Sequence, residues 1–123
     1  EEYTVMSNEA KNPGKVTLCV SNAYQKKFYL NENFNQLPQS IREELKIMCV
    51  LYTEDVGGIL ELVFDEDGTL EFKTSCEEND FLYDEIGSVL KIKQYQNEKR
   101  DLLEALEMFY KMIYLGEGFE EED

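Results

Sequence analysis

Carboxylates are the only plentiful side chains in this sequence that could do chemistry. The 123 residues include 27 Asp and Glu but no His, which excludes Ser-His-Asp and Cys-His catalysis and His-based zinc sites. Glu54, Asp55, Asp84 and Glu85 could supply a carboxylate pair for hydrolysis, but no spacing rule distinguishes them from chance neighbours. We therefore expect a protein without catalysis or cofactor, with a carboxylate-based, metal-dependent enzyme as an alternative.

The acidic segment 65–68, Asp-Glu-Asp-Gly, is the best candidate for a cation site. Its two Asp residues fall in register with a calcium loop whose glycine is Gly68. Positions one and twelve of that loop would be Val63 and Thr74, however, so two essential oxygen ligands are missing. The segment instead predicts a hairpin turn, because Gly accepts the positive φ that such turns require.

The charge balance limits the kinds of partner. The net charge of −15 makes us expect neither a nucleic acid nor an anionic membrane, and it fits either a basic protein or a merely well-solvated surface. Lys91, Lys93, Lys99 and Arg100 form a small basic group. Because Lys91 and Lys93 lie about 200° apart around a helix, these residues do not make one patch.

Three widely spaced cysteines, Cys19, Cys49 and Cys76, predict reduced thiols that are mostly small core residues. The start of the chain is acidic, unlike a signal peptide. No apolar run approaches the roughly 18 residues of a membrane span. We therefore expect a cytoplasmic protein.

The candidate residues must be positioned by a sheet and two helices. Alternating apolar residues on both sides of the acidic turn predict a β-hairpin over residues 57–74. Residues 15–21 are rich in β-branched side chains and predict a strand, and residues 24–30 predict a second, lysine-bearing edge strand.

A first helix is expected to begin at Ser40, because Ser40 and Glu43 have the spacing of a capping box. It should continue through the apolar run 47–52 and stop at Gly57 and Gly58. A strand over 47–52 is the alternative.

A long second helix is predicted from about residue 81 to residue 115, with Asn79 or Asp80 as its cap. At 1.5 Å per residue it would be about 50 Å long, more than a sheet of short strands can cover. It therefore either bends near residues 94–101 or projects and is covered by dimerisation. Apolar residues recur near one stripe of its first half: Ile86, Val89, Ile92 and Tyr95. The predicted partner contacts lie in its second half: Leu102, Leu106, Phe109, Tyr110 and Ile113.

These elements predict an α+β fold with two layers in the order ββαββα. An antiparallel sheet would be covered by one medium helix and one long C-terminal helix, with hairpin neighbours paired. We expect a flexible arm over residues 1–14, a single domain over 15–116 and an acidic tail over 117–123.

The run LKIMCVLYTEDVGGILELVFDEDG and the later LYDEIGSVLKIKQ resemble a small uncharacterised bacterial family from Gram-positive anaerobes, a domain of unknown function. The resemblance covers residues 15–116 and implies a short cytosolic protein. It brings no catalytic or binding residues to this chain.

The leading functional hypothesis is a non-enzymatic interaction or regulatory module that forms a homodimer through the long helix. It follows from the absence of His and of known motifs, and from an apolar helix too long for its domain. A small acidic chaperone or nucleic-acid mimic that binds a basic partner is the alternative from another class.

Overall fold

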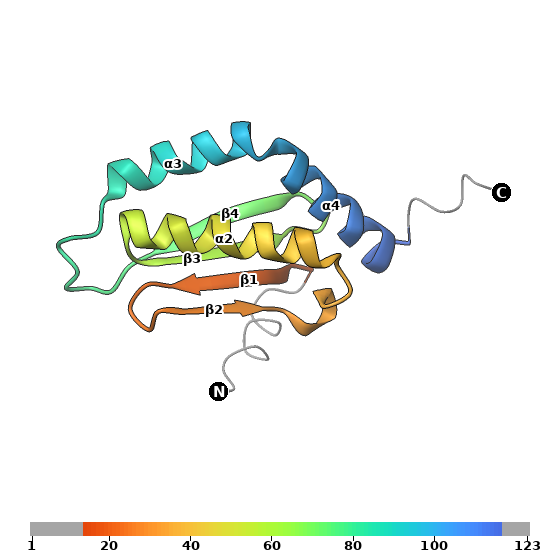
Figure 1. The fold of residues 1–123 in the computed structure, drawn as a ribbon, viewed down its shortest axis with the longest axis horizontal. Coiled ribbons are helices and arrows are strands. Elements are labelled where there is room, and N and C mark those ends of the chain that lie inside the picture. Colours follow the sequence, from red (N-terminus) through yellow and green to blue (C-terminus); the bar gives the residue numbers. More distant parts are fainter. Residues whose placement is uncertain (1–13, 117–123) are drawn as a thin grey trace.

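A four-stranded antiparallel sheet with helices packed on one face forms the part of the chain that the computed structural model describes, residues 14–116 (Figure 1). The expected tail lies outside the described residues, as does the expected arm apart from Gly14. The elements are β1 (Val16–Asn22), β2 (Lys27–Leu30), η1 (Glu32–Phe34), α2 (Gln39–Val56), β3 (Ile59–Phe64), β4 (Leu70–Ser75), α3 (Glu85–Glu98) and α4 (Arg100–Tyr114). The predicted α+β class is confirmed.

The strand order is β2-β1-β3-β4, and all three pairings are antiparallel. Both predicted hairpins are present, and they join through β1 and β3, where Val20 lies opposite Glu61. The register shifts between Thr17 and Cys19, which makes Leu18 an extra residue in β1. Successive side chains of a strand normally point to opposite faces of the sheet, and this alternation fails here, so that both Leu18 and Cys19 are buried.

The hairpin turn after β3 is made by the side chain of Asp65. Its Oδ1 accepts hydrogen bonds from the backbone N–H groups of Asp67 and Thr69, at 2.9 and 3.0 Å. Gly68 has φ +87°, the left-handed conformation that the Asp-Gly pair predicts. The second strand of the first hairpin is shorter than expected, because Asn22 caps a turn over residues 23–26 and β2 begins only at Lys27.

Helix α2 includes the whole apolar run 47–52, so the predicted helix is confirmed and the alternative strand is wrong. It begins at Gln39, one residue before the predicted start, and the predicted Ser40 cap was wrong: Pro38 takes the cap position without a side-chain hydrogen bond. Glu43 does not return to a Ser40 cap, because its carboxylate accepts a hydrogen bond from the Gln39 amide. The helix ends at Gly57, whose φ is +87°.

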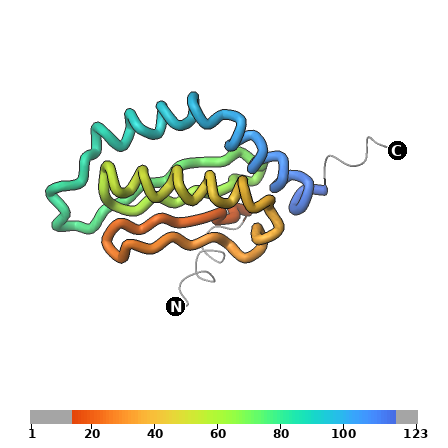
Figure 2. Tube along the Cα trace, viewed as in Figure 1, coloured from red at the N-terminus to blue at the C-terminus, as the bar shows by residue number. Residues whose placement is uncertain are grey.

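The expected long helix is divided into α3 and α4, and the tube in Figure 2 shows the chain turning between them. The break is at Lys99, whose backbone leaves helical geometry at φ −105° and ψ 26°. This break lies within residues 94–101, where the sequence predicts a bend if the long helix does not project from the domain. The predicted caps were wrong, because the cap is Asp84, which accepts from the Gly87 N–H at 2.8 Å. The Asp80 side chain is instead engaged in the preceding loop.

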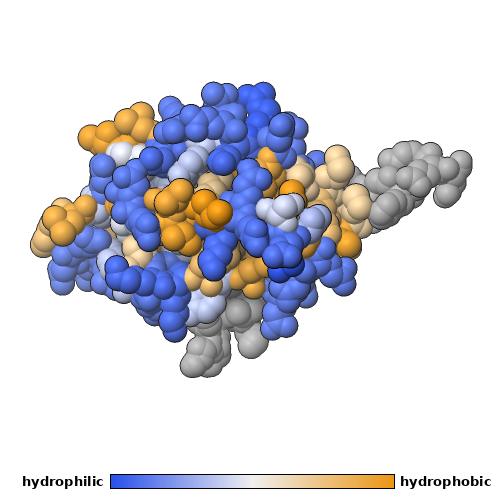
Figure 3. Space-filling model, viewed as in Figure 1, coloured by the Kyte–Doolittle hydropathy of each residue, from blue (hydrophilic) through white to orange (hydrophobic). Residues whose placement is uncertain are grey.

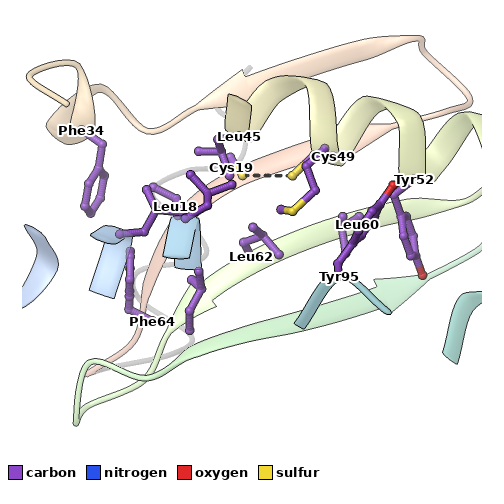
Figure 4. Close-up of a cluster of buried hydrophobic side chains, with 14 of the residues drawn as sticks. Leu18, Cys19, Phe34, Leu45, Cys49, Tyr52, Leu60, Leu62, Phe64 and Tyr95 are labelled. Carbon is purple, nitrogen blue, oxygen red and sulfur yellow. Dashed lines mark hydrogen bonds between the residues drawn. The ribbon is translucent and has the colours of Figure 1, made fainter. Parts of the chain in front are cut away.

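The core lies between the sheet and the helices (Figure 4). Leu60, Leu62 and Phe64 on alternate positions of β3 are fully buried, and Tyr52 of α2 and Phe34 of η1 are buried with them. Side chains of this size supply most of the hydrophobic stabilisation. Among the described residues, the core is therefore built from the inner face of the sheet and the helices that cover it.

Candidate functional site

The predicted partner contacts on α4 lie mostly inside the protein's own core. Leu102, Leu106 and Tyr110 are buried, Phe109 is partly buried, and only Ile113 is half exposed. The Tyr110 ring stacks on Phe64 with centroids 4.5 Å apart. The apolar stripe of α4 is thus covered by the sheet, which leaves Ile113 as the one residue of this set that is open to a partner.

A different apolar surface is open to solvent. It lies on the outer side of α3 and on the loop before it, and we call it the α3 surface. Its members and their exposed fractions are Phe81 90%, Leu82 93%, Ile86 76%, Val89 53% and Leu90 62%. Figure 3 shows hydrophobic side chains over the start of α3 and over this loop, and a further group over the middle of α2, where Ile47 and Leu51 are exposed.

Sequence reasoning placed Ile86 and Val89 in the buried stripe with Ile92 and Tyr95. These residues are spaced by threes, and each step of three turns about 60° short of a full turn of the helix. The row therefore rotates by about 180° from Ile86 to Tyr95, from the exposed side to the buried side. That drift was the signal in the sequence that could have identified the α3 surface.

The loop before α3 is fixed by hydrogen bonds. The hydroxyl of Tyr24 donates to Asp80 Oδ2 at 2.5 Å and accepts from the Glu77 N–H at 3.0 Å. The bond to Asp80 raises the pKa of the Tyr24 hydroxyl above its ordinary value. The N–H of Asp84 donates to the Val56 carbonyl at 3.2 Å, which ties the start of α3 to the end of α2.

Buried hydroxyl groups hold α3 against α2. Ser88 is hydrogen-bonded to the hydroxyl of Tyr52, and it accepts from the hydroxyl of Tyr83 at 3.0 Å. Burial raises the pKa of Tyr52 to about 12, so this hydroxyl stays protonated at neutral pH. The three groups therefore serve as structural hydrogen bonds and offer no activated nucleophile.

The basic residues of α3 and its C-cap divide between two directions. Lys91 Nζ lies 2.7 Å from Asp55 of α2, and Lys99 Nζ lies 3.6 Å from Glu44 of the same helix. Lys93 is exposed and makes no ion pair within residues 14–116. The prediction that Lys91 and Lys93 do not share a patch is therefore correct, and Lys93 lies beside the α3 surface.

Two of the cysteines face each other between the sheet and α2. The Sγ atoms of Cys19 and Cys49 are 3.8 Å apart, and both residues are buried (Figure 4). Burial raises the pKa of the Cys19 thiol well above its usual range, which disfavours the reactive thiolate. Cys76, in contrast, is exposed. Cys19 and Cys49 are core residues, as the sequence predicts.

The acidic groups of the described residues do not gather into a metal site. Within residues 14–116, no three Cys, Asp or Glu side chains are grouped so that they could hold a metal ion. One carboxylate oxygen of Asp65 already accepts two backbone hydrogen bonds in the hairpin turn.

Within residues 14–116, no helix combines the length and apolar content needed to cross a membrane.

Comparison with known proteins places the chain in a family. Neither a curated protein nor a solved structure matches it. A family model described as a family of unknown function, DUF6145, matches residues 15–118. This range includes every helix and strand described above and the whole α3 surface. It confirms the resemblance to an uncharacterised domain family. The chain therefore belongs to the family of unknown function DUF6145.

Proposed function

We propose that this protein is a non-enzymatic interaction module and that the α3 surface is where it binds another protein. The observation that carries the proposal is the exposure of Phe81, Leu82, Ile86, Val89 and Leu90, each at half or more of its surface. Together these side chains expose a large apolar area at the start of α3 and on the loop before it. Such area is characteristic of interaction surfaces.

The α3 surface is also held in place before any partner arrives. The loop is tied down at Asp80 and Glu77 by Tyr24, and α3 is fixed on α2 through Ser88. A surface that is already ordered loses little conformational entropy on binding, which favours affinity. A binding partner therefore explains the exposed apolar residues better than a loosely ordered loop does.

The chemistry of the remaining polar groups supports a role without catalysis. The hydroxyls of Tyr52 and Tyr83 are both hydrogen-bonded to the hydroxyl of Ser88 beneath α3. The two buried cysteines face each other in the core. Glu85, a carboxylate near the α3 surface, is exposed.

A photo-cross-linking amino acid at position 90 tests the proposal in the cells that make the protein. We expect a covalent adduct of defined mass from position 90. The matched control is the same amino acid at Glu54, an exposed polar position on α2, which should give none. Equal labelling from both positions, or no adduct from position 90, would contradict the proposal.

A basic protein partner is the second candidate, favoured by the net charge of −15. The loop beside the α3 surface adds Glu77, Glu78 and Asp80 to its border. If this candidate is correct, the adduct from position 90 contains a basic protein, and raising the salt concentration before irradiation abolishes it. An adduct that is insensitive to salt excludes it.

We also propose a cytoplasmic location. All three cysteines are free, and the sulfur atoms of two of them lie 3.8 Å apart without forming a disulfide bond. Reduced thiols in such proximity fit a reducing compartment. Fractionation of the cells, with the protein found in the membrane or outside the cell, would exclude it.

A further inference from the structure

One row of side chains on α3 is complementary to the same row running in the opposite direction. Glu85, Val89 and Lys93 are spaced by fours, so they lie nearly in line along one side of the helix. The row has an acid at one end, an apolar residue at the centre and a base at the other end. Ile86 and Leu90 lie beside it and are exposed.

The charged ends of this row have no partners within the described chain. Glu85 and Lys93 are exposed and make no ion pair among residues 14–116, whereas Lys91 and Lys99 are both paired with α2. Lys91 is turned towards Asp55, and Val89, two residues earlier, lies about 200° around the helix from it. The row therefore lies on the side of α3 that is turned away from α2.

We infer that the occupant of the α3 surface is a second copy of this chain, with the two α3 helices antiparallel around a two-fold axis at Val89. This inference rests on the proposed function. The axis places Glu85 of each copy opposite Lys93 of the other, so the row pairs with itself twice. A two-fold interface requires such self-complementarity, because the same surface serves on both copies.

The apolar area fits the same arrangement. Ile86, Val89 and Leu90 lie between the two charge pairs, and Phe81 and Leu82 extend the apolar area beyond α3. Two chains of charge −15 would repel each other over most of their surfaces, but the two Glu85–Lys93 pairs would offset part of that repulsion where the helices meet.

A basic partner fits the row less well than a second copy does. Lys93 lies next to Ile86 and Leu90, so a basic protein docked over these residues would meet a like charge without an acid beside it. A second copy instead brings Glu85 to that position. The charge order along the row thus selects the self-complementary occupant.

Sedimentation equilibrium of the full chain, from roughly 1 to 100 µM, tests the inference. We expect a mass of twice 14.4 kDa at the upper concentrations. Glu85→Lys and Lys93→Glu should each raise the dissociation constant about tenfold or more, because each creates two like-charge contacts. The double variant exchanges the two charges and should restore the dissociation constant to within about threefold of the original.

Two control variants carry the same change of charge at exposed positions away from the row. Glu104→Lys on α4 and Lys46→Glu on α2 should leave the dissociation constant unchanged. Circular dichroism of all variants verifies that the fold is intact, which is expected because every changed residue is exposed.

A monomer throughout the concentration range overturns the inference. So does a dimer in which the single variants behave like the controls, or in which the double variant is not restored. Cross-linking from position 90 separates this failure from failure of the proposed function. An adduct with a different protein would support the proposed binding surface and would show that its occupant is not a second copy of this chain.

Discussion

The hydroxyl of Tyr52 on α2 is hydrogen-bonded to the hydroxyl of Ser88 on α3, and both side chains are buried. This contact joins the helix that covers the centre of the sheet to the helix that carries the exposed apolar surface. Because Ser88 also accepts from Tyr83, one small residue satisfies two buried or partly buried phenols. The orientation of α3 therefore depends on Ser88.

Ser88→Ala should lower the free energy of unfolding by about 1 to 3 kcal/mol, since it leaves the buried Tyr52 hydroxyl without its partner. Urea denaturation measures this difference. Ser40→Ala, at an exposed serine without a side-chain hydrogen bond among the described residues, is the matched control and should change stability by less than about 0.5 kcal/mol. Equal effects of the two substitutions would contradict the structural role of Ser88.

Gly58→Ala should be among the most damaging single substitutions. An added Cβ would lie 2.6 Å from the Ser75 carbonyl oxygen and 2.7 Å from Cε1 of Tyr83, and φ is +74°. Strain and overlap together should cost about 3 kcal/mol or more. Gly116→Ala is the control, because φ is +69° there but no atom lies within 4 Å of the added Cβ. Thermal unfolding that ranks Gly116→Ala as the worse substitution would refute this account.

Stability should fall in alkaline solution. Burial raises the pKa of Tyr52 from its ordinary value of 10.0 to about 12. Below pH 10 the hydroxyl is protonated in both states, whereas between pH 10 and 12 only the unfolded state releases the proton. The stabilisation that protonated Tyr52 gives the folded state is therefore lost as pH rises through this window, and the free energy of unfolding falls by an amount on the order of 2 kcal/mol.

Burial also raises the pKa values of Tyr95 and Tyr110, so their titration acts in the same direction. Unfolding free energies at pH 9 and pH 11 measure the loss. In Tyr52→Phe the loss should be smaller than in the original chain, although this variant starts from a lower stability because Ser88 loses a partner. An unchanged pH dependence in Tyr52→Phe would show that Tyr52 does not titrate as described.

One thiol per native chain should react rapidly with a maleimide or a disulfide reagent. Cys76 is exposed, whereas Cys19 and Cys49 are buried, and burial raises the pKa of Cys19. In denaturant all three cysteines should react. A Cys76→Ser variant should lose the rapid reaction under native conditions and keep only the slow reaction of the two buried cysteines. Rapid labelling of this variant under native conditions is the outcome that would disprove burial of the other two thiols.

Local patterns predict much of this fold because their causes are local. The turn at Gly68 follows from the conformational freedom of Gly and from the Asp65 side chain, which both act within five residues. The stop of α2 at Gly57 has the same origin. The extra residue Leu18 in β1 was not predictable in this way, because a bulge depends on the partner strand.

Which apolar residues stay exposed depends on tertiary structure, and the apolar pattern alone does not distinguish them from residues that the sheet covers. Leu102, Leu106 and Tyr110 repeat at helical spacing whether the sheet or a partner covers them. Their burial follows from the break at Lys99, which lets α4 pack on the sheet. On α3, residues spaced by threes rotate from the exposed side at Ile86 to the buried side at Tyr95, which leaves the apolar residues at its start uncovered.

Radical footprinting of single side chains measures most directly whether the α3 surface is covered by protein. Oxidation of Leu90 and Ile86 should be slowed in intact cells relative to dilute purified protein, while oxidation of Leu51, exposed on α2, should not be. The comparison does not depend on the identity of the partner. Protection of Leu90 and Ile86 without protection of Leu51 is the predicted result. Equal oxidation of Leu90 in both settings would contradict the assignment of the α3 surface as a binding site.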